Sequence, residues 1–192
     1  MPNNSLALLF SDEMLKGTKT MGNKRKKTPY TERPDITKIK SNWNKVCGLL
    51  EREEWSSAIL RAATASEIAA NLAIREELQV KRNLESEFVD SLLLWANGIQ
   101  GKFDHLLRPV TKGTPAHSKF KEIKEKVTEI NKERNLVAHS GQFKKPSTAK
   151  KVALDAKEVI EMVVGEYHEG FRLKDLEKHL TSTSSRRRKP RG

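Results

Sequence analysis

The sequence has a single cysteine, Cys47, among its 192 residues. One cysteine excludes an internal disulfide and any zinc site built on several thiolates. Cys47 lies in a stretch with helical spacing, which favours a small buried side chain over a nucleophile. Cysteine chemistry is therefore not expected to carry the function.

Long hydrophobic runs are also missing. No uninterrupted apolar stretch approaches the roughly 18 residues that a membrane-spanning helix needs, and residues 6–10 are too short and too poorly flanked by basic residues for a secretory signal. With 36% hydrophobic and 32% charged residues, the composition is that of a soluble globular protein. We expect a cytoplasmic protein with no membrane partner.

Several motifs of known chemistry are absent from the sequence. It has no glycine-rich phosphate loop, no His-Glu-x-x-His pair and no nucleophile elbow. His117, His168 and His179 do not have the spacing of metal ligands. These absences predict no cofactor and no metal. Among the acidic residues only Glu67 occupies a position where a core residue is expected, which argues against a two-metal nuclease.

Basic residues outnumber acidic ones, 37 to 25, which gives a formal net charge of +12. Most of this excess lies at the ends, because residues 1–34 carry +4, residues 181–192 carry +5 and residues 35–180 carry only +3. Such ends attract nucleic acid or any acidic surface without sequence preference. They are equally typical of solvated tails, and in a eukaryotic cell they would resemble nuclear import signals.

The apolar spacing divides the chain into three parts. Residues 1–34 are expected to be a flexible basic N-terminal arm, residues 35–180 a helical domain and residues 181–192 a disordered basic tail. No segment alternates apolar and polar residues as a half-buried strand does. The fold class is therefore all-α, with four to five long helices in a mainly antiparallel bundle. The helices are expected at 35–50, 55–79, 86–107, 115–139 and 147–167, with a short terminal piece that carries Leu173, Leu176 and Leu180.

Helix starts and faces follow from the same spacing. Asp35 is expected to cap the first helix, and Ser147 or Thr148 the fifth. The helix at 86–107 has the widest apolar face, including Phe88 and Trp95, so it is expected to be buried on more than one side, against the core and a partner subunit.

One charged residue interrupts the apolar stripe of the fourth helix. The stripe is formed by Phe120, Ile123, Val127, Ile130 and Val137, and Arg134 occupies its missing position. A buried guanidinium without a partner costs several kcal/mol, so a carboxylate, a phosphate or a subunit boundary is expected beside it. Glu67 interrupts the stripe of the second helix in the same way. It is the candidate partner of Arg134, in the same chain or across a dimer, unless it lies at the solvated edge of its stripe.

His139 follows Arg134 by five residues. On a continuous helix the two would point about 140° apart. Because Gly141 is the type of residue that ends helices, we expect the helix to end before His139 and the imidazole to turn back toward Arg134. Asn135 lies four residues before His139 and shares its face.

The string Arg134-Asn135-Leu136-Val137-Ala138-His139-Ser140-Gly141, set between two amphipathic helices, resembles the Arg-x4-His motif of HEPN domains. This resemblance implies a small helical bundle that acts as a homodimer, and a metal-independent endoribonuclease of toxin–antitoxin or antiphage systems with a possible cognate antitoxin. It also implies attack by the ribose 2′-OH, which leaves a 2′,3′-cyclic phosphate and a 5′-hydroxyl. The HEPN toxins paired with nucleotidyltransferases carry a tyrosine soon after the histidine, whereas Gln142 and Phe143 stand here.

The resemblance gives the motif residues their roles. His139 would move protons, Arg134 would hold the phosphate and stabilise its developing charge, and Asn135 would orient the imidazole or bind a phosphate oxygen. RNA is then the expected partner. Its backbone is expected along the lysines that follow the motif, unless these are only solvated: Lys144, Lys145, Lys150 and Lys151.

Three other interpretations remain open at this point. Arg134 and His139 can simply complement the negative end of their helix. The domain can be HEPN-like but non-catalytic, as a dimerising or partner-binding module. The basic tails can carry a nucleic-acid-binding function of their own.

Overall fold

The computed structural model describes residues 28–176, and within this range every regular element is a helix. The all-α fold class is therefore confirmed for this part of the chain. Most of the N-terminal arm, the whole tail at 181–192 and Leu180 lie outside the described residues. Residues 28–34 lead into the first long helix through one short turn of 3₁₀ helix.

The elements follow one another along the chain with short connections. In order they are η1 (Tyr30–Glu32), α1 (Asp35–Glu51), α2 (Trp55–Arg75), the π-helix η2 (Glu76–Val80), α3 (Ser86–Trp95), α4 (Gly98–Gly101), the π-helix η3 (Lys102–Leu107), α5 (Arg108–Val110), α6 (Pro115–Glu122), α7 (Lys124–Ser140) and α8 (Pro146–Gly165).

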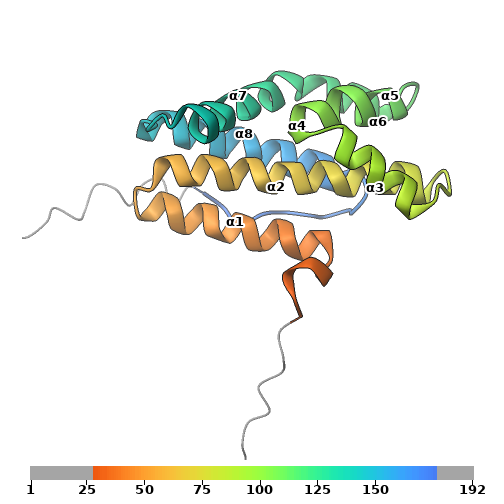
Figure 1. Cartoon of the computed structure of the whole chain (residues 1–192), viewed down its shortest axis with the longest axis horizontal. Helices are drawn as coiled ribbons and strands as arrows, with labels where there is room; N and C mark the ends of the chain where they lie inside the picture. The colour runs from red at the N-terminus through yellow and green to blue at the C-terminus, as the bar shows by residue number, and fades with distance from the viewer. Residues whose placement is uncertain (1–27, 177–192) are drawn as a thin grey trace, which may run out of the picture.

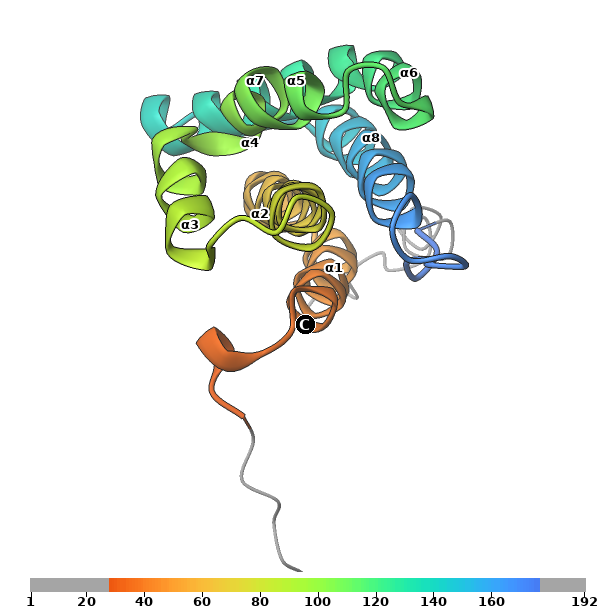
Figure 2. The same cartoon turned by 90° about the vertical axis from the view of Figure 1, so that its right-hand side faces the viewer.

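Helix α2 is the centre of the fold. Figure 2, a view along the helix, shows α1, α3, α7 and α8 arranged around it, and its most extensive contacts are with α1 and α8. Its alanines are buried, and such small side chains let neighbouring helices approach closely. Apolar residues at helical spacing form the face of α1 that packs on the core: Ile39, Trp43, Val46 and Leu50 are buried, and Ile36 is half-buried. Cys47 is buried beside them, as expected.

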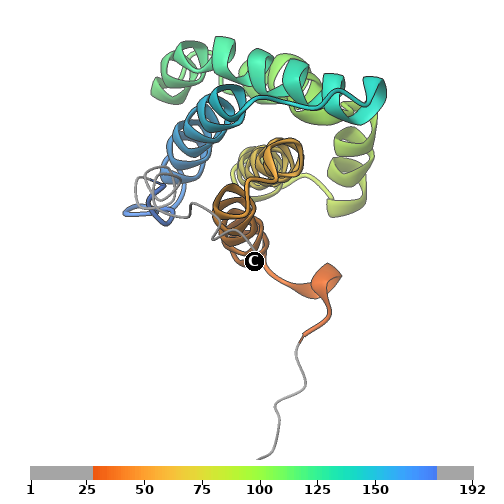
Figure 3. The same cartoon turned by 90° about the vertical axis from the view of Figure 1, so that its left-hand side faces the viewer.

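Helices α7 and α8 complete the core (Figures 1 and 3). α7 packs on α2 and α8, so its last turn lies at the end of the molecule where α1 turns into α2. Beyond α8 the chain continues without helix to residue 176 and runs back along α1. Trp43 Nε1 donates to Lys174 O at 2.8 Å, which fixes this return segment. Leu173 and Leu176, two members of the predicted terminal piece, are buried there in a segment that is not helical.

The single helix predicted at 86–107 is wrong. The chain leaves the helix after Trp95 and resumes at Gly98, whose φ of +72° is a left-handed conformation that favours glycine. The break turns the first part of the wide apolar face outward. Phe88 is 52% exposed and Trp95 is 67% exposed, so the core of this chain does not bury them, and their burial against a partner subunit stays a prediction.

Three further helix boundaries differ from the prediction. The helix predicted from Pro115 to the motif is interrupted at Ile123, where the backbone leaves helical geometry between α6 and α7. α8 begins at Pro146 and makes no side-chain cap, so neither Ser147 nor Thr148 caps it. Asp35 is the first helical residue rather than a cap, and its carboxylate pairs with Arg75 across the α1–α2 pair.

Candidate functional site

The site is built on the last turns of α7. The helix continues through Ser140, so the predicted end before His139 is wrong. Gly141 is the residue just past the helix, as predicted, with a left-handed φ of +60°. His139 is therefore held by regular helical hydrogen bonding and is exposed to solvent.

The three predicted catalytic residues contact one another without any loop. Arg134 Nη1 lies 3.2 Å from His139 Nε2 and 2.9 Å from Asn135 Oδ1. The arginine side chain is long enough to reach His139 around the helix, although the two residues start on different faces. A guanidinium only donates hydrogen bonds, so Nε2 accepts and the neutral ring carries its proton on Nδ1. The site thus pairs a cation with an imidazole that can accept or donate a proton.

The residue buried on the core side of α7 is Glu133 rather than Arg134. Arg134 is only half-buried, and this corrects its predicted place in the apolar stripe. Lys144 Nζ lies 2.8 Å from Glu133 Oε2, a close ion pair whose angles are not those of a hydrogen bond. The two side chains are only 10% and 9% exposed. Because the Lys144 side chain is nearly buried in this ion pair, the predicted contact between Lys144 and an RNA backbone is not favoured.

The other predicted RNA-contacting lysines lie at the start of α8. Lys151 donates to Asp155 at 3.1 Å, and this hydrogen bond raises the pKa of Lys151. Lys150 is half-buried, whereas Lys145 is exposed. Of the four lysines, Lys145 is the one that is exposed and has no interaction with another described side chain.

The loop after the motif is fixed to the beginning of α2. Ser56 Oγ accepts from the Lys144 backbone N–H at 3.0 Å and lies 3.5 Å from the Gln142 carbonyl oxygen, to which it donates. Together with the Glu133–Lys144 pair, these bonds hold the loop beside the motif. These hydrogen bonds join Ser56 to residues far away in the sequence. The position of Ser56 in the first turn of α2 is the one sequence feature that points to them.

Glu67 does not contact Arg134 within the chain. Its Oε1 accepts from Lys102 Nζ at 2.9 Å, and the Lys102 side chain is 5% exposed. Lys102 Nζ also lies 3.3 Å from the Ala96 carbonyl oxygen, at the break after α3. Glu67 therefore anchors η3 to α2. The predicted pair with Arg134 in the same chain is wrong, and the pair across a dimer stays a prediction.

The Glu67→Gln variant is expected to be less stable by about 2 kcal/mol, because the buried Lys102 ammonium loses its countercharge while the half-exposed Glu67 site moderates the cost. Urea unfolding measures the change, with the exposed Glu87→Gln as the matched control. A variant as stable as the control would show that the pair contributes nothing.

Gly141→Ala is expected to destabilise the chain by about 1 kcal/mol, because an L side chain is strained in the left-handed conformation even though a Cβ there meets no atom within 4 Å. Gly165 is the control, since its added Cβ also meets nothing but its φ is helical. Gly165→Ala is expected to be neutral or slightly stabilising. Thermal unfolding compares the two, and equal melting temperatures would refute the strain at Gly141.

No protein-family model, curated protein or solved structure matches this chain. Across residues 28–176, none of the helices combines the length and the apolar character needed to cross a membrane. Over the same residues, no group of three or more His, Cys, Asp or Glu side chains is placed to hold a metal ion.

Proposed function

We propose that the chain is a metal-independent endoribonuclease of HEPN type with a HEPN-like helical bundle. The observation that carries this proposal is the contact between Arg134 and His139 at the exposed end of α7. A phosphate-binding cation, a proton-transferring imidazole and an amide lie within one helical turn and a half, open to solvent. These are the groups that RNA cleavage through the 2′-OH needs.

The chemistry follows from the geometry of the pair. In the free protein, the Arg134 guanidinium occupies the Nε2 lone pair of His139. A phosphate that binds the guanidinium competes for this donor and leaves Nε2 able to accept the 2′-OH proton. The 2′-oxygen then attacks the phosphorus, the bond to the 5′-oxygen breaks, and the products are a 2′,3′-cyclic phosphate and a 5′-hydroxyl after the leaving oxygen takes up a proton.

The leaving 5′-oxygen needs an acid, and one imidazole cannot be base and acid in the same step. A homodimer in which two motifs face one cleft supplies the second histidine. We propose this arrangement, in a cytoplasmic protein whose activity serves toxin–antitoxin or antiphage defence and is restrained by a cognate partner. The dimer is the feature most open to direct measurement.

The proposal is tested by incubating a single-stranded RNA with the protein in excess EDTA and determining the chemistry of the new ends. Cleavage that persists in EDTA and leaves 2′,3′-cyclic phosphates supports it. Cleavage that requires a divalent cation, or that leaves 3′-hydroxyl ends, contradicts it.

A second candidate function is a non-catalytic, HEPN-like dimerising module. It is favoured by the apolar side chains that α3 exposes, with Leu94 82% and Trp95 67% exposed beside Phe88. Monomers seldom expose large contiguous apolar patches. Light scattering on the Trp95→Ser protein tests this use of α3, because a dimer that persists unchanged would show that α3 is not its interface.

A further inference from the structure

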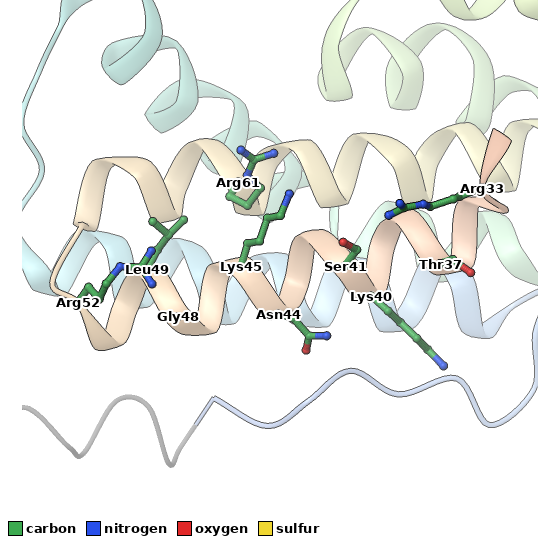
Figure 4. A pocket seen from close by; sticks show the side chains of 10 residues that line it. All are labelled: Arg33, Thr37, Lys40, Ser41, Asn44, Lys45, Gly48, Leu49, Arg52 and Arg61. Atoms are coloured by element: carbon green, nitrogen blue, oxygen red, sulfur yellow. The ribbon is translucent and has the colours of Figure 1, made fainter. Parts of the chain in front are cut away.

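A groove of about 810 Å³ runs along the outer side of α1 and reaches α2 (Figure 4). Five of its ten lining residues are basic and none is acidic. The basic residues are Arg33, Lys40, Lys45, Arg52 and Arg61; the others are Thr37, Ser41, Asn44, Gly48 and Leu49. We call this surface the α1–α2 groove.

The cations of the α1–α2 groove are poorly neutralised. Among the described residues, Arg52 is the one of the five that pairs with a carboxylate, Glu54 Oε1 at 2.6 Å, and that pair is exposed. Arg61 donates to the amide oxygen of Asn42 at 3.1 Å. Figure 4 shows Lys45 reaching from α1 toward Arg61 on α2. Like charges held this close repel each other, and a bound anion would offset the repulsion.

The remaining lining residues indicate which anion fits. Thr37 and Ser41 offer uncharged hydrogen-bonding groups beside these cations, which suit phosphate oxygens and ribose hydroxyls. Lys40 and Asn44 point to the other side of α1 from Lys45 and Arg61 (Figure 4), where Lys40 Nζ lies 5.5 Å from the centroid of the Phe171 ring. Leu49 is the single large apolar residue of the lining, so the groove has little to hold a hydrophobic anchor of a protein or a lipid. α1 is about 25 Å long at 1.5 Å per residue, enough for several nucleotides.

The groove reaches the motif end of the molecule. Arg52 lies at the turn from α1 into α2, and Ser56, one turn further, binds the loop that follows His139. We propose that the α1–α2 groove binds the phosphate backbone of the single-stranded RNA that Arg134 and His139 cleave. This inference rests on the proposed function for the identity of the ligand, and it replaces Lys144 and Lys151 as the main backbone contacts.

The test measures RNA binding by fluorescence anisotropy. The probe is an unstructured, fluorescein-labelled 20-nucleotide RNA, and every protein is the full chain with His139→Ala so that the probe stays intact. The groove variant is Lys45→Gln/Arg52→Gln, because both side chains are exposed and their loss leaves the core unchanged. The matched control is Lys112→Gln/Lys121→Gln, two exposed lysines on the α5–α6 side with the same change in charge.

The groove variant is expected to bind the RNA roughly 10-fold more weakly at about 0.1 M salt, and its plot of log affinity against log salt is expected to lose about 1.4 units of slope, because each phosphate contact on a single strand contributes about 0.7. The control is expected to stay within about twofold of the parent. Equal affinities of groove variant and control would overturn the inference. The inference would also be overturned if the groove variant bound polyglutamate more weakly than the control but bound RNA equally well. That result would assign the groove to an acidic protein.

Cleavage by the same variants with His139 intact separates the two proposals. Groove-dependent binding without cleavage by the parent rejects the nuclease and supports the groove as an RNA site. Cleavage by the parent with an unchanged KM in the groove variant supports the nuclease and rejects the groove.

Discussion

The His139→Ala protein is expected to cleave RNA at least roughly 100-fold more slowly than the parent, because a positioned proton-transfer group contributes about 10²–10⁴-fold to such a reaction. Arg134→Ala is expected to lose a comparable factor, since it removes the cation that stabilises the developing phosphate charge. Arg134→Lys should restore little activity, because an ammonium lacks the planar fork of the guanidinium. Initial rates on a labelled RNA measure all three.

The control for these variants is His105→Ala, which removes an exposed histidine that contacts Trp95 and lies outside the motif. It is expected to retain the parent rate. The melting temperatures of the motif variants should stay near that of the parent, because Arg134 is half-buried and His139 is exposed. A His139→Ala protein that is folded and as active as His105→Ala would refute a catalytic role for the motif.

The largest stability effect is expected at Glu77 in the π-helix η2. Its side chain is 2% exposed and accepts hydrogen bonds from Lys81, Arg82 and Tyr167 at 2.7, 2.7 and 2.9 Å. Tyr167 lies just beyond α8, and Arg82 also donates to the Val110 carbonyl oxygen at 2.6 Å. One carboxylate thus joins the ends of α2, α5 and α8.

Glu77→Gln is expected to lower the free energy of unfolding by about 3 kcal/mol, because it leaves two cations and a phenol without their shared acceptor charge. For a domain of this size that corresponds to a fall in melting temperature of roughly 10 °C. Thermal and urea unfolding measure it, with the exposed Glu87→Gln as the matched control. A loss of less than about 0.5 kcal/mol would show that the network is solvated rather than structural.

The same carboxylate makes stability depend on pH. Burial acts to raise the pKa of Glu77, but the hydrogen bonds from Lys81, Arg82 and Tyr167 outweigh it and hold the pKa below its ordinary value of 4.5. The unfolded chain therefore binds the proton more readily. The contribution of Glu77 to the free energy of unfolding is fully present above the pKa of the unfolded state and is lost as the pH falls below it. The difference in free energy of unfolding between the parent and Glu77→Gln should therefore become smaller in acid.

The long helices could be predicted because each carries its own signal. The spacing of Ile39, Trp43, Val46 and Leu50 is sufficient to place the buried face of α1. The break after Trp95 could not be predicted in the same way, since apolar residues continue at helical spacing across it. The left-handed φ of Gly98 and the buried Lys102 that binds the Ala96 carbonyl oxygen decide that geometry.

The site was predicted to the extent that it is local. Asn135 and His139 lie four residues apart, so their shared face follows from the helix. The contact between Arg134 and His139 was predicted through a helix end that the structure does not have, and the long arginine side chain makes it on a continuous helix instead. The sequence does not show that Glu133 rather than Arg134 faces the core, because the burial of Glu133 depends on its ion pair with Lys144 in the loop after the helix. The α1–α2 groove also escaped prediction, since its cations come from three segments and carry no motif.

The most direct test of the central claim compares two 20-nucleotide substrates of identical sequence, one RNA and one DNA, under the same conditions in EDTA. Cleavage by 2′-OH attack predicts that the RNA is cut and that the DNA, which lacks the nucleophile, stays intact. Cleavage of the DNA at a comparable rate would contradict the mechanism and with it the assignment of Arg134 and His139.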